Sequence, residues 1–338
     1  MSIKELNTWY KKNKRMLPFR ESQDPYAIWV AEIMLQQTQV VTMLPYYEAF
    51  LLRFKDIQSL ASVSFEEILP YVRGLGYYRR FRLMHQAAIQ IQKNYHGKFP
   101  TNYKDIRGLP GIGDYTAGAI MSTAFKKPYS ALDGNVMRVL TRVYMIDDDI
   151  KKPKTMKQLN QLNQSLIDIN EPDIYTHAMM ELGATICKPT QPNCHKCPLN
   201  DMCQSYEHQV QHLYPFKSKP QSKKHIQLMT CIITDDHNRY LIKKETQSLF
   251  EGMYLFLQIE SESVTYTIEW LESLGIIVDH IKSMKKFKHV FTHQIWYMDV
   301  HHFKLKSLKS KSIDLVSFDD QKFKMMPIAH LKIYEFLK

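Results

Sequence analysis

The spacing of hydrophobic residues changes along the chain and predicts two folded parts. Residues 1–205 contain long segments in which apolar residues recur with the 3.6-residue period of a helix. Residues 226–338 contain shorter β-rich runs bounded by turn residues, such as MTCIIT, YLIKKE and FTHQIWYMDVHHF. This second part also has two helical patterns, TYTIEWLESLG and PIAHLKIYEFLK, so we expect an all-α domain followed by an α+β domain.

A basic segment joins the two parts. Residues 206–225 include proline and have little apolar periodicity, which is typical of a linker. The length of 338 residues exceeds what one hydrophobic core usually organises, in agreement with two domains.

One carboxylate interrupts an almost continuous apolar helix pattern. In DPYAIWVAEIMLQQTQV, Asp24 and Pro25 have the residue types of a helix cap and first turn, and the residues after them are apolar to Leu35 except for Glu32. Such a helix is buried on most sides. Glu32 is therefore either paired with a buried cation, Arg15 or Arg20, or desolvated with a raised pKa and able to act as an acid.

Two glycines spaced by one residue mark a hairpin in LPGIGDYTAGAI. Gly111 and Gly113 supply the backbone freedom of a tight turn, and Asp114 is predicted to cap the helix that follows. Backbone amides exposed at such a hairpin form a seat for a phosphate, although an ordinary turn between helices has the same pattern.

A second carboxylate precedes the next helix, in SALDGNVMRVL. Asp133 has the position of an N-cap, a role that needs no catalysis. A carboxylate held by helix amides is expected to keep a low pKa and remain ionised, which also suits a residue that faces developing positive charge.

Four of the five cysteines, Cys187, Cys194, Cys197 and Cys203, lie within seventeen residues. In a reducing compartment such thiols are expected to ligate one metal centre rather than form disulfides. Zinc and an iron–sulfur cluster compete, and the wide spacing around the single Cys-x-x-Cys pair fits the larger cluster better. The fifth cysteine, Cys231, is predicted to be buried in a strand.

Composition indicates which partner and which cellular compartment to expect for the protein. The formal charge of +11 suits a polyanionic partner, although a solvated basic face gives the same charge. We find no apolar run of membrane-spanning length and no secretory signal, so we expect a cytoplasmic protein.

Taken in order, EIMLQQTQV, GLGYY, LPGIGDYTAGAI, LDGNVMRV, MMELGATIC and the cysteine loop resemble the adenine DNA glycosylases of the MutY family. The resemblance covers nearly the whole chain. It implies a helix-hairpin-helix glycosylase core with a [4Fe–4S] cluster in residues 1–205, and a Nudix-like lesion-recognition domain in residues 226–338. Within the core, it implies a helix-hairpin-helix module over about 24–132 and a cluster module formed by 1–23 and 133–205.

The resemblance also implies roles for individual residues. Glu32 would protonate adenine at N7, and Asp133 would stabilise the sugar cation, either through space or by a transient covalent bond. Tyr115 and Asn135 match positions that support these carboxylates. Gln37 and Tyr77 match residues that wedge into the duplex around the flipped base, although packing would also account for Tyr77. Three arginines follow this tyrosine: Arg79, Arg80 and Arg82. They either contact DNA phosphates or form a solvated basic face.

Departures from relatives refine the expected activity. Relatives that also cleave the strand have a lysine where this chain has Tyr115, which cannot form a Schiff base, so we expect a monofunctional enzyme that leaves an abasic site. The family's Phe-Ser-His loop, which recognises 8-oxoguanine, matches Phe291, Thr292 and His293, and an exposed hairpin tip is the alternative for this segment. In the Nudix-box helix, Ile268 replaces an arginine and Ser273 a glutamate, which argues against metal-dependent hydrolysis.

The expected partner is double-stranded DNA that carries adenine opposite 8-oxoguanine or guanine. A bacterial cytoplasm, association with the nucleoid through DNA, and a monomer complete this hypothesis. Two alternatives stay open from the sequence: an endonuclease III-like enzyme acting on oxidised pyrimidines, and a non-catalytic DNA-binding protein that uses the cluster as a structural or redox element.

Overall fold

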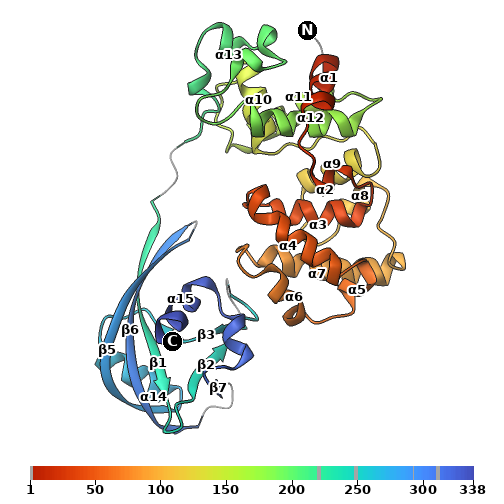
Figure 1. Cartoon of the computed structure of the whole chain (residues 1–338). Coiled ribbons are helices and arrows are strands. Elements are labelled where there is room, and N and C mark those ends of the chain that lie inside the picture. Colours follow the sequence, from red (N-terminus) through yellow and green to blue (C-terminus); the bar gives the residue numbers. More distant parts are fainter. Residues whose placement is uncertain (1–2, 219–221, 247–249, 292, 310–312) are drawn as a thin grey trace. The chain divides into compact units, whose positions relative to one another are not determined.

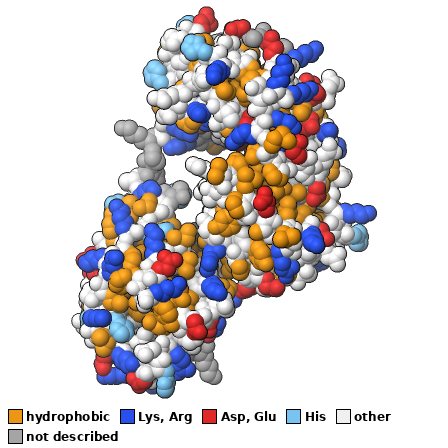
Figure 2. All heavy atoms as spheres, viewed as in Figure 1, with side chains coloured by type: hydrophobic (Ala, Val, Ile, Leu, Met, Phe, Trp, Pro, Cys, Tyr) orange, Lys and Arg blue, Asp and Glu red, His pale blue; other side chains and the backbone are white. Residues whose placement is uncertain are grey.

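The computed structural model describes residues 3–218, 222–246, 250–291, 293–309 and 313–338 (Figure 1). The chain divides into two compact units, residues 1–63 with 77–219 and residues 64–76 with 220–338. None of the helices in these described ranges is long and apolar enough to cross a membrane. Lys and Arg side chains are spread over both units on the face seen in Figure 2.

The first unit is helical, as the periodicity of residues 1–205 predicts (Figure 1). Its elements are α1 (Ile3–Asn13), α2 (Pro18–Glu21), α3 (Pro25–Leu35), α4 (Val40–Arg53), α5 (Ile57–Ala61), α7 (Arg79–Tyr95), α8 (Tyr103–Arg107), α9 (Asp114–Thr123), α10 (Gly134–Val143), α11 (Pro153–Leu166), α12 (Pro172–Thr185), η1 (Cys194–Lys196), η2 (Asn200–Met202), α13 (Gln204–Glu207) and η3 (Gln211–Leu213). Helix α6 (Phe65–Val72) belongs to the residues of the second unit.

Helix α3 is buried on nearly all sides. Asp24 accepts hydrogen bonds from the backbone N–H groups of Tyr26 and Ala27, and Pro25 occupies the first helical position. Every residue from Tyr26 to Met34 is buried, and the helix packs against α4, α7 and α9. The structure confirms the cap and the burial that the sequence predicts.

The turn between α8 and α9 depends on glycine. Gly111 has φ +75°, and a Cβ at this position would lie 2.8 Å from the Cβ of Leu83 in α7. The N-cap residue of α9 is Gly113, so the prediction that Asp114 caps this helix is wrong. Asp114 is already helical, and Arg107 donates a hydrogen bond of 2.6 Å to its carboxylate.

Helix α10 connects segments that are far apart in the sequence. Its apolar face shares one core with Leu6 of α1, Leu159 of α11 and Leu182 of α12. The approach of α10 to α12 is close, because a Cβ on Gly183 would lie 2.5 Å from the Cβ of Asn135. This packing fixes the start of α10, where Asp133 and Asn135 are located.

The second unit is an α+β structure, as predicted. Its strands are β1 (Lys224–Thr234), β2 (Tyr240–Lys244), β3 (Tyr254–Leu255), β4 (Leu257–Ile259), β5 (Ile276–Val290), β6 (Gln294–Leu308) and β7 (Ile313–Val316), and its other elements are α14 (Val264–Ser273), η4 (Gln321–Met325) and α15 (Ile328–Leu337). The main path of the sheet is β3-β2-β1-β6-β5, with β4 paired to β1 and β7 to β2. Strands β1 and β6 are parallel, and β5 and β6 form an antiparallel hairpin.

Alternate residues of β1 face two different cores, as the pleat of a strand requires. Ile232 packs in a core with η4 and α15, whereas Cys231 and Ile233 pack in a core with Leu271 of α14. Helices therefore cover both faces of the sheet. Cys231 is fully buried, which confirms the prediction that it is a strand residue.

Candidate active site

A cavity of about 630 Å³ opens in the helical unit. Its walls come from α2, α3, the loop after α3 and the start of α4, both ends of α9, the first turn of α10, and α12. Glu32, Tyr115, Asp133 and Asn135 all line it, so the structure brings the four predicted residues together. The volume is within the range of roughly 300–1,000 Å³ that small-molecule sites occupy.

Glu32 is the buried carboxyl group of this cavity. Only 9% of the residue is exposed, and the Tyr115 hydroxyl donates a hydrogen bond of 2.6 Å to its Oε2. Burial raises the pKa of Glu32 to about 7, with a further contribution from Asp133, while Tyr115 and Arg20 act in the opposite direction. Glu32 can therefore exist as a neutral acid near neutral pH.

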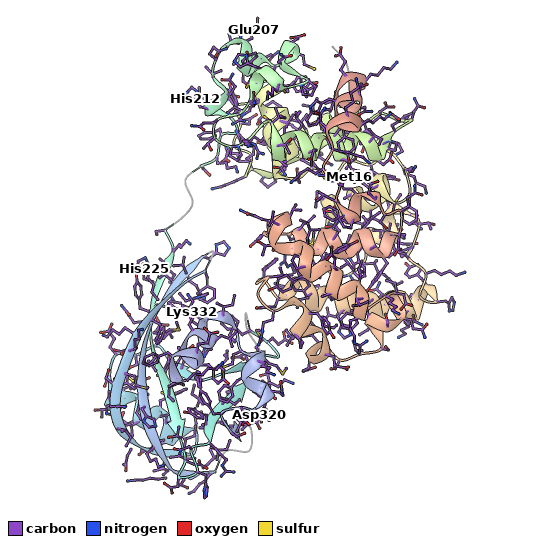
Figure 3. All side chains as sticks on the ribbon, viewed as in Figure 1. Met16, Glu207, His212, His225, Asp320 and Lys332 are labelled. Atoms are coloured by element: carbon purple, nitrogen blue, oxygen red, sulfur yellow. The ribbon has the colours of Figure 1, made fainter. Side chains whose placement is uncertain are left out.

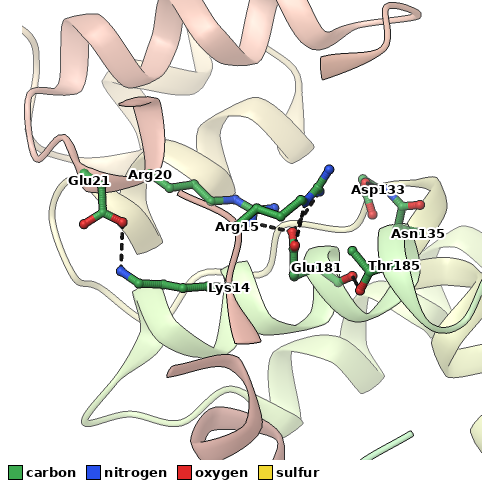
Figure 4. Close-up of polar contacts among 8 residues, drawn as sticks. All are labelled: Lys14, Arg15, Arg20, Glu21, Asp133, Asn135, Glu181 and Thr185. Carbon is green, nitrogen blue, oxygen red and sulfur yellow. Dashed lines mark hydrogen bonds and ion pairs between the residues drawn. The ribbon is translucent and has the colours of Figure 1, made fainter. Parts of the chain in front are cut away.

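The cations considered as partners of Glu32 bind another carboxylate. Arg15 donates two hydrogen bonds, of 2.6 and 2.8 Å, to Glu181 of α12, and Arg20 also pairs with Glu181 (Figure 4). Burial disfavours the ionised form of Glu181, but the hydrogen bonds and positive charges of both arginines outweigh it and lower its pKa. Of the two alternatives for Glu32, the structure supports the desolvated acid.

Asp133 caps α10, as predicted, but its pKa moves in the direction opposite to the expected one. Its Oδ1 accepts a 2.7 Å hydrogen bond from the Val136 N–H, and its Oδ2 accepts one of 2.8 Å from the Asn135 amide. Burial nevertheless raises the pKa of Asp133, because desolvation exceeds the effect of these hydrogen bonds. The prediction of a low pKa considered the hydrogen bonds from the helix amides but not the burial of the Asp133 carboxyl group.

Asn135 is held on both sides. Its amide nitrogen donates to Asp133, and its Oδ1 accepts a 2.8 Å hydrogen bond from Arg138. Arg138 also donates to the backbone carbonyls of Gly183 and Cys187. These bonds fix the orientation of the Asn135 amide, so that its N–H group faces Asp133.

Sequence analysis missed several residues that line the cavity, including Phe19, Thr123, His177 and Met180. Burial lowers the pKa of His177 to about 3, and Arg20 and Lys14 contribute in the same direction, so its imidazole is neutral. These residues come from α2, α9 and α12, and no local motif marks them. Only their helical spacing relative to known site residues could have indicated them.

Gln37 and Tyr77 are both exposed and both have left-handed backbone conformations, with φ values of +58° and +48°. Gln37 lines the cavity in the loop after α3, and Tyr77 lies just before α7, with 49% of its surface exposed. Packing alone does not account for a tyrosine that is exposed to this extent. In the hairpin, Gly111 and Gly113 immediately precede α9, the helix whose first turn carries Tyr115.

The three arginines after Tyr77 do not form one basic face. Arg79 is exposed, but Arg80 is only 3% exposed and donates hydrogen bonds to the Met34 and Gln36 carbonyls and to the Thr38 hydroxyl. Neither a phosphate contact nor a solvated surface therefore describes Arg80. Its guanidinium is buried and donates its hydrogen bonds to other residues of the protein.

The four clustered cysteines line one small apolar cavity beneath α10. Arg142 donates to the Cys187 sulfur at 3.3 Å, and the Leu199 N–H donates to the Cys197 sulfur at 3.4 Å. In the part of the chain that the structure describes, no three His, Cys, Asp or Glu side chains are grouped as ligands of a single metal ion. The segment after this loop carries Glu207 and His212, labelled in Figure 3.

The predicted lesion loop lies between β5 and β6 of the second unit. Phe291 is half-buried and packs against Trp296, Phe250 and His289, while His293 is exposed. Thr292 is outside the described residues. On α14, the Ser273 hydroxyl donates to the Trp270 carbonyl and supplies no carboxylate where a Nudix box would have one.

Known proteins match both parts of the chain. Residues 30–164 match the HhH-GPD superfamily of base excision DNA repair proteins, and residues 229–336 match the NUDIX domain. The adenine DNA glycosylase of Buchnera aphidicola subsp. Acyrthosiphon pisum is 34% identical over 292 residues, which cover 86% of this chain and 83% of that protein. This chain belongs to the adenine DNA glycosylases.

Other similarities agree with this membership. The human adenine DNA glycosylase is 41% identical over 209 residues, which cover 59% of this chain and 38% of that protein. Among solved structures, a thermostable thymine-DNA glycosylase superposes with a TM-score of 0.57 at 28% identity, over 61% of this chain and 95% of its own. An endonuclease III–DNA complex gives a TM-score of 0.53 at 22% identity, over 62% and 94%, which shows the shared helical fold.

The glycosylase is therefore a hydrolase of N-glycosyl bonds that excises adenine in base excision repair. The resemblance and the fold class predicted from the sequence, a helix-hairpin-helix core with a Nudix-like domain, are confirmed. The alternatives of a non-catalytic DNA-binding protein and of an enzyme for oxidised pyrimidines are wrong for a member of this family.

We expect Glu32→Gln to stabilise the folded glycosylase at alkaline pH. Folding raises the pKa of Glu32 from 4.5 to about 7. The folded state therefore favours the protonated form of Glu32. As the pH rises from 4.5 to about 7, the free energy of unfolding decreases, and above pH 7 this loss stays constant. The substitution should add about 3 kcal/mol at pH 8 and less than about 1 kcal/mol at pH 5.

Urea denaturation at both pH values measures this difference. Glu21→Gln is the matched control, because Glu21 is exposed and pairs with Lys14 at the surface. An equal effect of Glu32→Gln at pH 5 and pH 8 would contradict a buried acid with a raised pKa.

Proposed function

We propose that this glycosylase removes adenine opposite 8-oxoguanine or guanine, with Glu32 as the acid and Asp133 as the electrostatic partner. The observation that carries the proposal is the buried Glu32 carboxyl group, with a pKa of about 7, in the same cavity as Asp133. A general acid works best when its pKa is close to the operating pH. The cavity thus pairs a proton donor with a second carboxylate.

In this mechanism, the Glu32 carboxyl proton passes to N7 of the flipped adenine. The C1′–N9 bond then breaks, its electron pair leaves with the neutral base, and positive charge develops on the sugar. The Asp133 carboxylate, which is oriented by hydrogen bonds from the Val136 N–H and the Asn135 amide, stabilises that charge. Water adds to C1′ and gives up a proton to the Glu32 carboxylate, which leaves an abasic site and restores the acid.

Tyr115 supports the acid and limits the reaction to base removal. Its hydroxyl donates to Glu32 and holds that side chain in one orientation. A phenol cannot form the Schiff base that a lysine at this position would form, so strand cleavage is not part of the reaction. This arrangement supports a monofunctional glycosylase.

Gln37, Tyr77 and the hairpin are proposed to bind the duplex. The two exposed side chains replace stacking that is lost when adenine leaves the helix, a cost of a few kcal/mol. The amides at Gly111, Gly113 and the start of α9 are proposed to bind a backbone phosphate, an arrangement supported by the left-handed turn at Gly111.

The second unit is proposed to read the base opposite adenine. 8-Oxoguanine differs from guanine by a carbonyl at C8 and a hydrogen on N7. A hydroxyl such as that of Thr292 can accept from this N7–H group, and its extra methyl compared with serine leaves the hydrogen-bonding atoms in place. Phe291 and His293 are its neighbours in the sequence.

A [4Fe–4S] cluster is proposed to be held by Cys187, Cys194, Cys197 and Cys203. The four cysteines line one small apolar cavity, and the wide spacing on either side of the Cys194–Cys197 pair fits a larger centre better than a single zinc ion. N–H donors to the sulfurs, from Arg142 and Leu199, are typical surroundings of such a cluster. When bound, the cluster would crosslink the loop that follows α12.

We also propose that the enzyme acts as a monomer on double-stranded DNA. Binding to DNA would place the enzyme on the bacterial nucleoid.

The first expected outcome concerns the acid. The enzyme should release free adenine from a duplex with adenine opposite 8-oxoguanine, with strand breaks only after alkali, and should not process an oxidised pyrimidine. Single-turnover rates should fall by about tenfold per pH unit above pH 7, as Glu32 loses its proton. Glu32→Gln should reduce the rate by at least about a hundredfold while duplex affinity stays within about twofold. A rate that is independent of Glu32 or of pH between 6 and 9 would refute this role.

The second outcome concerns the opposite base. Phe291→Ala and His293→Ala should each reduce the preference for 8-oxoguanine over guanine by about tenfold, equivalent to the loss of one or two contacts. The rate with guanine opposite adenine should change little. Val290→Ala, an exposed change in the same hairpin, is the control. An unchanged preference in both variants would remove the lesion-reading role of this loop.

The third outcome concerns the metal centre. Purified enzyme should contain about four iron and four sulfide per chain, and Cys197→Ser should lose most of both. Cys231→Ser should retain them, because Cys231 is buried in the other unit. Zinc in place of iron in the native enzyme would contradict the proposed cluster.

A further inference from the structure

Arg80 is a buried arginine. It lies at the start of α7 with only 3% of its surface exposed, and burial lowers its pKa to about 10, which leaves it charged at neutral pH. A buried charge is costly unless hydrogen bonds compensate it. Arg80 obtains that compensation from a different helix, α3.

The guanidinium binds the C-terminal end of α3. Nη1 donates to the Met34 carbonyl at 3.1 Å and to the Gln36 carbonyl, and Nη2 donates to the Thr38 hydroxyl at 3.0 Å. The last carbonyls of a helix have no partners within the helix and carry its negative partial charge, so a cation is favoured there. The acceptors surround Gln37 on both sides in the sequence.

The backbone of Arg80 binds the loop that carries Tyr77. Its N–H donates to the Tyr77 carbonyl at 3.2 Å. One residue therefore contacts the segment that carries Gln37 through its side chain and the residue Tyr77 through its backbone. We call residues 36–38 and 77–78 the wedge loops.

Both wedge loops contain strained backbone. Gln37 and Tyr77 have positive φ values, and a non-glycine residue in this region costs about 1 kcal/mol or more unless its surroundings hold it. The hydrogen bonds of Arg80 are the contacts that connect the two strained positions.

We propose that Arg80 is a positioning residue that locks the two wedge loops together, so that Gln37 and Tyr77 enter the duplex as one preformed element. The inference rests on the proposed role of these two residues as wedges. Arg80 does not touch the flipped adenine in this scheme. Its effect is on extrusion of the base and not on the breaking of the glycosidic bond.

The test compares adenines that differ in the cost of extrusion. Single-turnover release by Arg80→Met is measured with adenine opposite guanine and with adenine opposite an abasic site, where no pairing must be broken. We expect a loss of about thirtyfold on the paired adenine and of less than about threefold on the unpaired one, since only the first depends fully on the wedges. Equal losses on both duplexes would overturn the proposal.

Two controls separate positioning from other effects. Arg79→Met removes the same charge from an adjacent, exposed position, so any effect through phosphate should be equal on both duplexes. The pH at which release declines should be unchanged in Arg80→Met, because a displaced Glu32 would shift it. A shifted decline would assign the defect to the acid and overturn the proposal.

A double-mutant cycle addresses the pathway directly, and it uses Arg80→Lys as well in case Arg80→Met folds poorly. In a Gln37→Ala/Tyr77→Ala background, either Arg80 substitution should cost less than about a third of its effect in the native enzyme. Fully additive effects would overturn the role of Arg80. If Gln37→Ala/Tyr77→Ala itself releases adenine at the native rate, the proposed wedges fail instead.

Discussion

The burial of one carboxyl group in an apolar helix is the constraint on which the site depends. Glu32 lies in a helix whose residues from Tyr26 to Met34 are all buried, and its hydrogen bond comes from the neutral hydroxyl of Tyr115. A neutral donor holds the side chain without supplying a full positive charge, so the pKa of Glu32 stays raised. The fold thereby leaves much of this carboxyl group protonated near neutral pH.

The nearby cations are arranged so that this state persists. Arg15 and Arg20 are close enough to line the same cavity, yet both are bound to Glu181. Arg20 still lowers the pKa of Glu32, but this contribution is smaller than that of burial, and its ion pair is made with Glu181.

Much of the fold and part of the site could be predicted from the sequence. The cap at Asp24, the buried helix after it and the placement of Asp133 before α10 follow from local patterns. The pairing of Arg15 and Arg20 with Glu181 could not be predicted from local patterns, because the two arginines are over 160 positions away from Glu181 in the chain. The raised pKa of Asp133 and the burial of Arg80 were missed for a related reason, since depth in the fold is a property of several helices together.

Helix α10 links the candidate active site to the cysteine loop. Its first turn holds Asp133, and farther along it Arg138 and Arg142 bind the carbonyl and the sulfur of Cys187. Arg138 also binds Asn135, so the cysteine loop and the carboxylate share one short, rigid support. A displacement of the Cys187 backbone would therefore also disturb Arg138, the Asn135 amide that Arg138 holds, and the hydrogen bond from that amide to Asp133.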